Sequence, residues 1–130
     1  MADGQKLTGL RRVLRSSRVS YAAFRHGLRH DVAIKEVCLG AAVLVVLSAL
    51  LPVTMLEHLV LVLSPMLVVL VEFVNSAIES AVDRISEEQH PLSGLAKDYA
   101  NVAVVIAVLM LALSWVVIGG PILLRWLRGV

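Results

Sequence analysis

The chain of 130 residues has the length of a single domain, yet 58% of its residues are hydrophobic and only 17% are charged. Its mean hydropathy of +0.85 is too high for a soluble domain of this size. This composition excludes soluble enzymes and disordered linkers, and the single cysteine excludes a disulfide-stapled secreted fold. Most of the chain is therefore expected to lie in a lipid bilayer.

The net charge of +2 conceals a strong asymmetry along the chain. Eight of the twelve lysines and arginines lie between Lys6 and Lys35, before the first apolar segment. By the positive-inside rule, this N-terminal segment is expected to stay in the cytoplasm. Contacts with membrane lipids explain the basic cluster, so no nucleic-acid partner is expected.

Residues 1–30 have the pattern of an amphipathic helix on a membrane surface. At 100° per residue, six apolar residues of this region fall within one narrow arc: Leu7, Leu10, Leu14, Tyr21, Phe24 and Leu28. Arg18 and Arg25 interrupt this arc, and three serines weaken its middle. We therefore expect two short surface helices with a bend between them.

Three apolar segments predict transmembrane helices over residues 33–51, 55–85 and 95–118. Pro52 leaves room only for a tight hairpin after the first helix. The second is ~46 Å long against ~30 Å of hydrocarbon, so its end should project into the cytoplasm. A loop over 86–94 follows, and Gly119, Gly120 and Pro121 should end the third helix. The fold class is an all-α membrane protein with one domain over residues 1–130 and its C-terminus outside.

The segment from Val71 to Arg84 carries polar residues within an apolar helix. Glu72, Asn75, Glu79 and Asp83 are spaced by three, four and four residues, so they share a face about 80° wide. We call these four residues the polar stripe. Counted from Met55, Glu72 lies ~25 Å and Glu79 ~36 Å along the helix, which places the stripe at the inner membrane interface.

Three interpretations of the polar stripe are open at this point. A cation-coupled transporter would place its carboxylate near the bilayer centre, whereas a site joining a lipid headgroup to a water-soluble cosubstrate belongs at the interface. The depth of the stripe favours the second. A purely structural stripe that hydrogen-bonds neighbouring helices would need only Ser, Thr or Asn.

Lys97 and Asp98 stand together at the start of the third predicted helix. An ammonium group and a helix N-terminus favour an anion, while clustered carboxylates favour a divalent cation. Together they suggest a metal-bound polyphosphate. The alternative is a Lys-Asp pair that anchors the membrane end of the helix. The chain has no GxxxxGK[ST] or GxGxxG motif.

The chain closely resembles the prokaryotic integral-membrane diacylglycerol kinases in four stretches: Glu72-Phe-Val-Asn-Ser-Ala-Ile-Glu79, Val82-Asp83-Arg84, His90-Pro-Leu-Ser-Gly and Ala96-Lys97-Asp98. The resemblance implies a homotrimer of three-helix subunits in the bacterial cytoplasmic (inner) membrane, with its active site on the cytoplasmic side. It also implies transfer of the γ-phosphoryl group of ATP, with Mg²⁺, to the hydroxyl of diacylglycerol, giving phosphatidic acid. Undecaprenol, the acceptor of related members, is the nearest alternative.

The resemblance also implies a role for individual residues. It makes Glu72 the catalytic base, assigns the metal to Glu79 and Asp31, and leaves Glu36 as the rival of Asp31. Asn75, Asp98 and Asn101 take positioning roles. The implied nucleotide contacts are Arg12, Arg25, Lys97, Asp98, Glu79 and Asp31.

Overall fold

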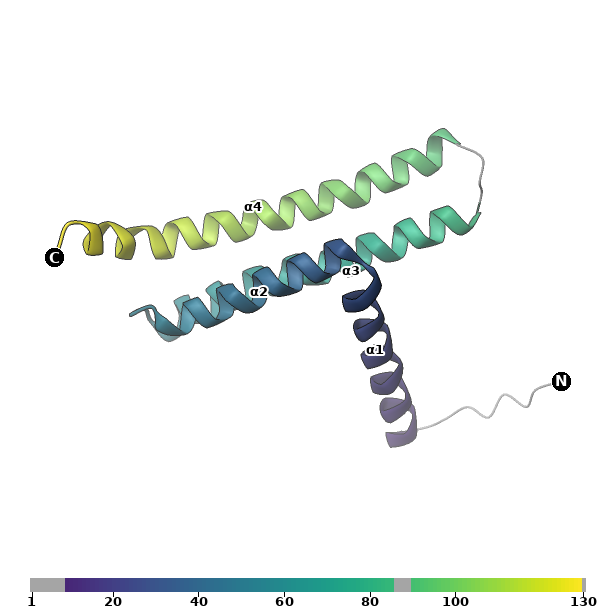
Figure 1. Ribbon diagram of the computed structural model, residues 1–130, viewed down its shortest axis with the longest axis horizontal. Coiled ribbons are helices and arrows are strands. Elements are labelled where there is room, and N and C mark those ends of the chain that lie inside the picture. Colours follow the sequence, from purple (N-terminus) through teal and green to yellow (C-terminus); the bar gives the residue numbers. More distant parts are fainter. Residues whose placement is uncertain (1–8, 86–89, 130) are drawn as a thin grey trace.

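The computed structural model describes residues 9–85 and 90–129, and over these ranges it contains four helices. They are α1 (Leu10–His30), α2 (Val32–Leu50), α3 (Met55–Ile85) and α4 (Pro91–Leu127). α3 packs against both α2 and α4 along the long axis of the molecule, whereas α1 contacts α2 and leaves the bundle at a steep angle (Figure 1). α2, α3 and α4 are long and apolar enough to cross a membrane, which confirms the predicted all-α membrane class.

α1 is one continuous helix of 21 residues, so the expected bend between two short helices is wrong. The serines do not break it, because the Ser17 hydroxyl donates to the carbonyl of Val13 at 3.0 Å. A serine bonded in this way satisfies its hydroxyl within the helix and does not compete for the backbone. Leu10, Leu14, Tyr21 and Phe24 therefore share one face of a single helix, whereas Val19 lies on the opposite side.

The turn from α1 into α2 occupies a single residue. Asp31 has an extended backbone, with φ −108° and ψ 119°, and its Oδ1 accepts a hydrogen bond from the Ile34 N–H at 3.1 Å. This bond caps the N-terminus of α2. The other carboxylate oxygen, Oδ2, accepts from the Ser76 hydroxyl of α3 at 2.8 Å. Asp31 thus fixes the junction to α3 at the level of the polar stripe.

The junction packs closely at Gly27, which is the buried residue of α1 and has no side chain. A Cβ atom there would lie 3.0 Å from Ile34 Cδ1 and 3.1 Å from Phe73 Cε1. One turn earlier, Phe24 stacks on Phe73 with ring centroids 5.6 Å apart. The end of α1 therefore rests on the residue that follows Glu72 in the sequence.

We expect Gly27→Val to destabilise this junction by about 1–3 kcal/mol, because its methyl groups enter filled space. Thermal unfolding in detergent and hydrogen exchange at residues 24–34 would measure the change. Gly40→Val in α2 is the control, since apart from the adjacent residues and backbone of α2 itself, no described atom lies within 4 Å of a Cβ at Gly40. Equal stability of the two variants would show that Gly27 is not needed for the contact.

The hairpin between α2 and α3 is closed by a capping box. The Glu57 carboxylate accepts from the Thr54 N–H at 2.7 Å, and the Glu57 N–H donates to the Thr54 hydroxyl at 3.4 Å. α3 then begins at Met55, and it includes the buried Pro65 in its interior. Its bounds coincide with the predicted 55–85, while α2 lies one residue earlier than the predicted 33–51.

α4 differs from the prediction at both ends. It begins at Pro91 rather than residue 95, because His90 caps it by accepting from the Leu92 N–H at 3.2 Å and proline suits the first helical position. Of the predicted loop, residues 86–89 lie outside the described ranges. At its other end α4 continues through Pro121 to Leu127. Pro and Gly end helices in water, but an unwound backbone in lipid would leave its polar groups unsatisfied.

Candidate active site at the end of the spanning helices

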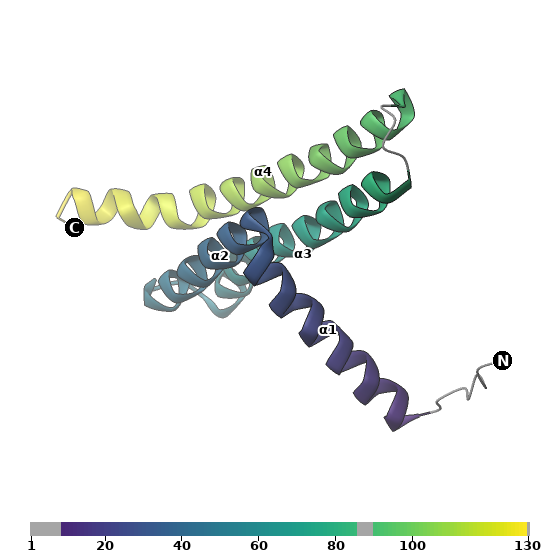
Figure 2. The ribbon, with the colours of Figure 1, turned by 45° about the vertical axis from the view of Figure 1, so that its right-hand side comes forward.

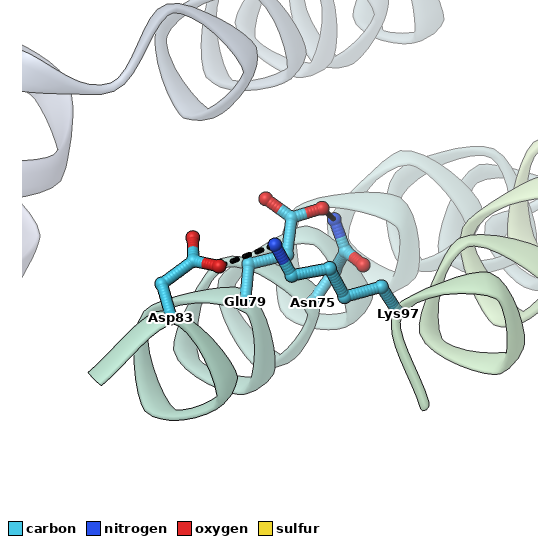
Figure 3. Close-up of polar contacts among 4 residues, drawn as sticks. All are labelled: Asn75, Glu79, Asp83 and Lys97. Carbon is cyan, nitrogen blue, oxygen red and sulfur yellow. Dashed lines mark hydrogen bonds and ion pairs between the residues drawn. The ribbon is translucent and has the colours of Figure 1, made fainter. Parts of the chain in front are cut away.

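The polar stripe lies on one side of α3, and its burial decreases toward the helix end. Glu72 and Asn75 are 6% and 8% exposed, whereas Glu79 and Asp83 are exposed. The Asn75 amide nitrogen donates to Glu79 Oε1 at 3.2 Å, one turn away, and Figure 3 shows both side chains on the same side of the helix. The stripe therefore runs from a buried carboxylate to an accessible one.

Asn75 Oδ1 is buried and has no hydrogen-bond partner within the described ranges. A buried acceptor left unsatisfied costs about 1–3 kcal/mol. Flipping the Asn75 side-chain amide by 180° does not remove this cost, because the NH₂ group would then lose its hydrogen bond to Glu79. Asn75 can thus accept a hydrogen bond from a hydroxyl group that approaches Glu72.

Asp31 lies beside the stripe through its bond to Ser76, the residue after Asn75. The Ile34 N–H holds the pKa of the Asp31 carboxyl below its ordinary value, and the Ser76 hydroxyl acts in the same direction. Asp31 therefore stays ionised near Glu72 and Glu79. The structure places Asp31 beside the stripe, and both of its oxygens already accept hydrogen bonds.

Lys97 reaches from α4 across to Asp83, the last residue of the stripe, and forms an ion pair with it (Figure 3). The side chains of Lys97 and Asp83 are 37% and 65% exposed, so the pair contributes at most about 1 kcal/mol. A phosphate group could displace Asp83 from Lys97 at little cost. Lys97 is in place to bind an anion at the open end of the stripe.

The remaining predicted residues lie apart from the buried end of the stripe. Asp98 and Asn101 are exposed on α4, Arg12 and Arg25 are exposed on α1, and Glu36 is exposed on α2. Within residues 9–85 and 90–129, no hydrogen bond or ion pair joins any of them to the stripe. Their predicted roles stay predictions.

Magnesium fits Glu79 better than it fits Asp31. No group of three or more acidic, His or Cys side chains in the described part of the chain is placed to hold a metal. Mg²⁺ bound to a nucleotide needs only one or two carboxylates in addition to the phosphates. Glu79 is exposed and gives one oxygen to Asn75, so its other oxygen is available.

Ser76, Gly27 and Phe73 position the site, and the sequence analysis missed all three. Ser76 and Asp31 are 45 residues apart, so no local spacing relates them. The signal at Gly27 was a glycine inside an amphipathic helix, where it costs about 1 kcal/mol relative to alanine unless packing requires it. Phe73 carried no signal, because an aromatic residue in an apolar helix is ordinary.

The fold and site together define a membrane protein whose spanning helices end in a group of carboxylates, an amide and a lysine. A family model described as prokaryotic diacylglycerol kinase matches residues 18–119. The chain belongs to this family. It is a kinase that acts on a lipid, and the transporter alternative is wrong.

Known diacylglycerol kinases align with this chain over most of its length. The chain is 34% identical over 110 residues to a diacylglycerol kinase of Haemophilus influenzae, an alignment covering 85% of this chain and 93% of the relative. The diacylglycerol kinase of Escherichia coli K12 is 35% identical over 111 residues, covering 85% and 91%. That of Pseudomonas aeruginosa is 37% identical over 111 residues, covering 85% and 90%.

Proposed function

We propose that this chain transfers the γ-phosphoryl group of ATP to the hydroxyl of diacylglycerol and releases ADP and phosphatidic acid. The observation that carries this proposal is the burial gradient of the polar stripe. The buried Glu72 and Asn75 suit a lipid hydroxyl at the membrane interface, while the exposed Glu79 and Lys97 suit a nucleotide from water. The two substrates would then meet along one face of α3.

In this proposal Glu72 is the general base. As the hydroxyl oxygen attacks the γ-phosphorus, its O–H bond breaks and its proton passes to the Glu72 carboxylate. The bond between the γ-phosphorus and the β,γ-bridging oxygen breaks, and ADP leaves with that oxygen. Before transfer, the single O–H of diacylglycerol would donate to Asn75 Oδ1, which has no partner among the described residues, and it would turn to the Glu72 carboxylate as the oxygen attacks.

The acidic character of the site supports a divalent cation. Glu72, Glu79 and Asp83 would repel the triphosphate unless positive charge intervened, and Lys97 supplies a single positive charge. We propose that Glu79 holds Mg²⁺ together with the nucleotide phosphates, with Asp31 as second ligand. The ion would neutralise phosphate charge, and Lys97 would leave Asp83 to bind a phosphate oxygen.

Glu79→Gln should raise the Mg²⁺ concentration needed for half-maximal activity by about tenfold or more, because a neutral amide binds Mg²⁺ weakly. Asp31→Asn should raise it more than Glu36→Gln. Kinase assays across a Mg²⁺ titration measure both effects. Since Asp31 also caps α2, thermal unfolding of Asp31→Asn without Mg²⁺ serves as the control. The opposite order of the two variants would assign the second ligand to Glu36.

We further propose that the chain works as a homotrimer in the bacterial inner membrane, with its N-terminus and site facing the cytoplasm. The arginines of α1 support this orientation by the positive-inside rule. Two observations support the oligomer. α4 exposes most of its apolar surface, and Asp98 and Asn101 are exposed without a described bond to the stripe. A neighbouring subunit could supply these residues to Glu72.

The acceptor is tested with labelled ATP and the purified chain in mixed micelles that contain one lipid alcohol at a time. Diacylglycerol should be phosphorylated with a higher kcat/KM than monoacylglycerol or undecaprenol. A preference for undecaprenol would change the acceptor and keep the phosphoryl-transfer site. Phosphorylation of none of the three would contradict the proposal.

A further inference from the structure

The Ser76 hydroxyl joins two segments of the chain that meet at the polar stripe. It donates to Asp31 Oδ2 at 2.8 Å, whereas Asp31 Oδ1 accepts from the Ile34 N–H at 3.1 Å. The two donors come from different helices, α3 and α2, and each holds one oxygen of the same carboxylate. The last side-chain torsion of an aspartate is otherwise broad. Together the two hydrogen bonds therefore fix the plane of the Asp31 carboxylate.

Ser76 also places Asp31 next to Glu79. Ser76 and Glu79 are three residues apart, so their side chains are neighbours on the surface of α3. In Figure 2, α1 extends away from the spanning helices, and only its C-terminal end lies close to them. Asp31 follows that end directly, so a hydrogen bond to α3 at this residue determines where its carboxylate lies.

The groups that hold Asp31 are neutral. In the part of the chain that the structure describes, the ion pair joins Lys97 to Asp83, and no lysine, arginine or histidine pairs with Asp31. An ionised carboxylate has about four lone-pair sites, and the two hydrogen bonds occupy one on each oxygen. Asp31 therefore keeps its negative charge and a free lone pair on each oxygen. Such a carboxylate suits a divalent cation that prefers oxygen ligands.

We propose, on the basis of the proposed function, that Ser76 is a positioning residue whose hydroxyl orients Asp31 as a ligand of the Mg²⁺ that Glu79 holds. An outer hydrogen bond to a ligating carboxylate sets its direction, and removing such a bond typically lowers metal affinity by about 10- to 100-fold. Ser76 itself touches neither the metal nor the substrates. Its effect on the reaction passes through Asp31.

The test measures binding of Mn²⁺, which takes the same oxygen ligands as Mg²⁺, to the full chain in detergent micelles. An ATP analogue with a methylene group in place of the β,γ-bridging oxygen is present, so no turnover occurs. Relaxation of the water protons reports the bound ion. Ser76→Ala should weaken Mn²⁺ binding by about tenfold. Ser76→Thr keeps a hydroxyl group and should restore the affinity of the parent chain.

Ser80→Ala is the matched control. It removes an exposed hydroxyl one turn further along α3 and should leave Mn²⁺ binding unchanged. Thermal unfolding of both alanine variants without metal shows that each is folded. Ser76→Ala leaves the bond from the Ile34 N–H to Asp31 in place, so α2 keeps its cap.

A double-mutant cycle shows whether the effect of Ser76 passes through Asp31. Asp31→Asn keeps the cap of α2, because the asparagine oxygen can accept from the Ile34 N–H, but it removes the charge. In this background Ser76→Ala should change Mn²⁺ binding by less than about twofold, because the ligand that it orients is gone. A serine that only stabilised the junction would give the same weakening in both backgrounds.

Three results would overturn the proposal: unchanged Mn²⁺ binding by Ser76→Ala, no recovery with Ser76→Thr, or equal weakening in the two backgrounds. Phosphorylation of diacylglycerol is measured on the same preparations. If the parent chain phosphorylates the lipid and any of the three results is found, only the role of Ser76 is wrong. A parent chain that phosphorylates no lipid contradicts the proposed function, whereas the Mn²⁺ cycle still decides the role of Ser76.

Discussion

Glu72→Gln should lower kcat by 10²-fold or more, the largest effect we expect from one substitution. Glutamine keeps the size and polarity of the side chain but cannot accept the proton of the lipid hydroxyl at neutral pH. MgATP binding should stay nearly intact, because the proposed nucleotide contacts at Glu79 and Lys97 are unchanged. Steady-state kinetics and a nucleotide-binding titration on the same preparation would separate the two effects.

Glu57→Gln is the matched control for Glu72→Gln. It makes the same chemical change at the other end of α3, and glutamine can replace glutamate in the capping box with Thr54. Its kcat should be close to that of the parent chain. If Glu72→Gln kept most of its kcat while both variants were folded, another group would be the base.

The second large effect is recovery of activity from two inactive variants. If Glu72 of one subunit works with Asp98 of its neighbour, Glu72→Gln and Asp98→Asn proteins should each be inactive alone and complement when mixed. In a cyclic trimer assembled at random from equal amounts, about one quarter of the sites receive an intact half from each parent. Unfolding and reassembling the proteins together should therefore restore about a quarter of the parent activity.

Tagged pull-down must first show that the two variants form mixed trimers. Activity near the quarter level then supports a site shared between subunits. Its absence from confirmed mixed trimers would place Glu72 and Asp98 of one subunit in the same site, and the proposal of a shared site would be wrong.

The sequence predicted the polar stripe because its geometry is local. A helical period of 3.6 residues places Asn75 and Glu79 one turn apart, and the structure joins them by a hydrogen bond of 3.2 Å. The tight hairpin predicted after Pro52 is also present, and the structure adds that Thr54 and Glu57 cap α3 there. Such features depend on residues within one turn of each other.

The sequence could not predict what depends on distant contacts or on the solvent. The bond from Ser76 to Asp31 and the closure of Ile34 and Phe73 around Gly27 join separate helices, which no spacing reveals. The sequence predicted too early an end for α4 for another reason. The rule that Gly and Pro end helices comes from proteins in water, where an open backbone can bond to solvent. In an apolar segment the helix continues past Pro121.

The central claim, that the polar stripe transfers phosphate from ATP to a lipid alcohol, is tested most directly by counting both products of one reaction. The purified chain is given labelled ATP, Mg²⁺ and diacylglycerol, and ADP and phosphorylated lipid are measured over the same time. We predict one phosphatidic acid for each ADP, almost no ADP without the lipid, and loss of both products with Glu72→Gln. ADP formed at the same rate with and without diacylglycerol, and no labelled lipid, would contradict the account.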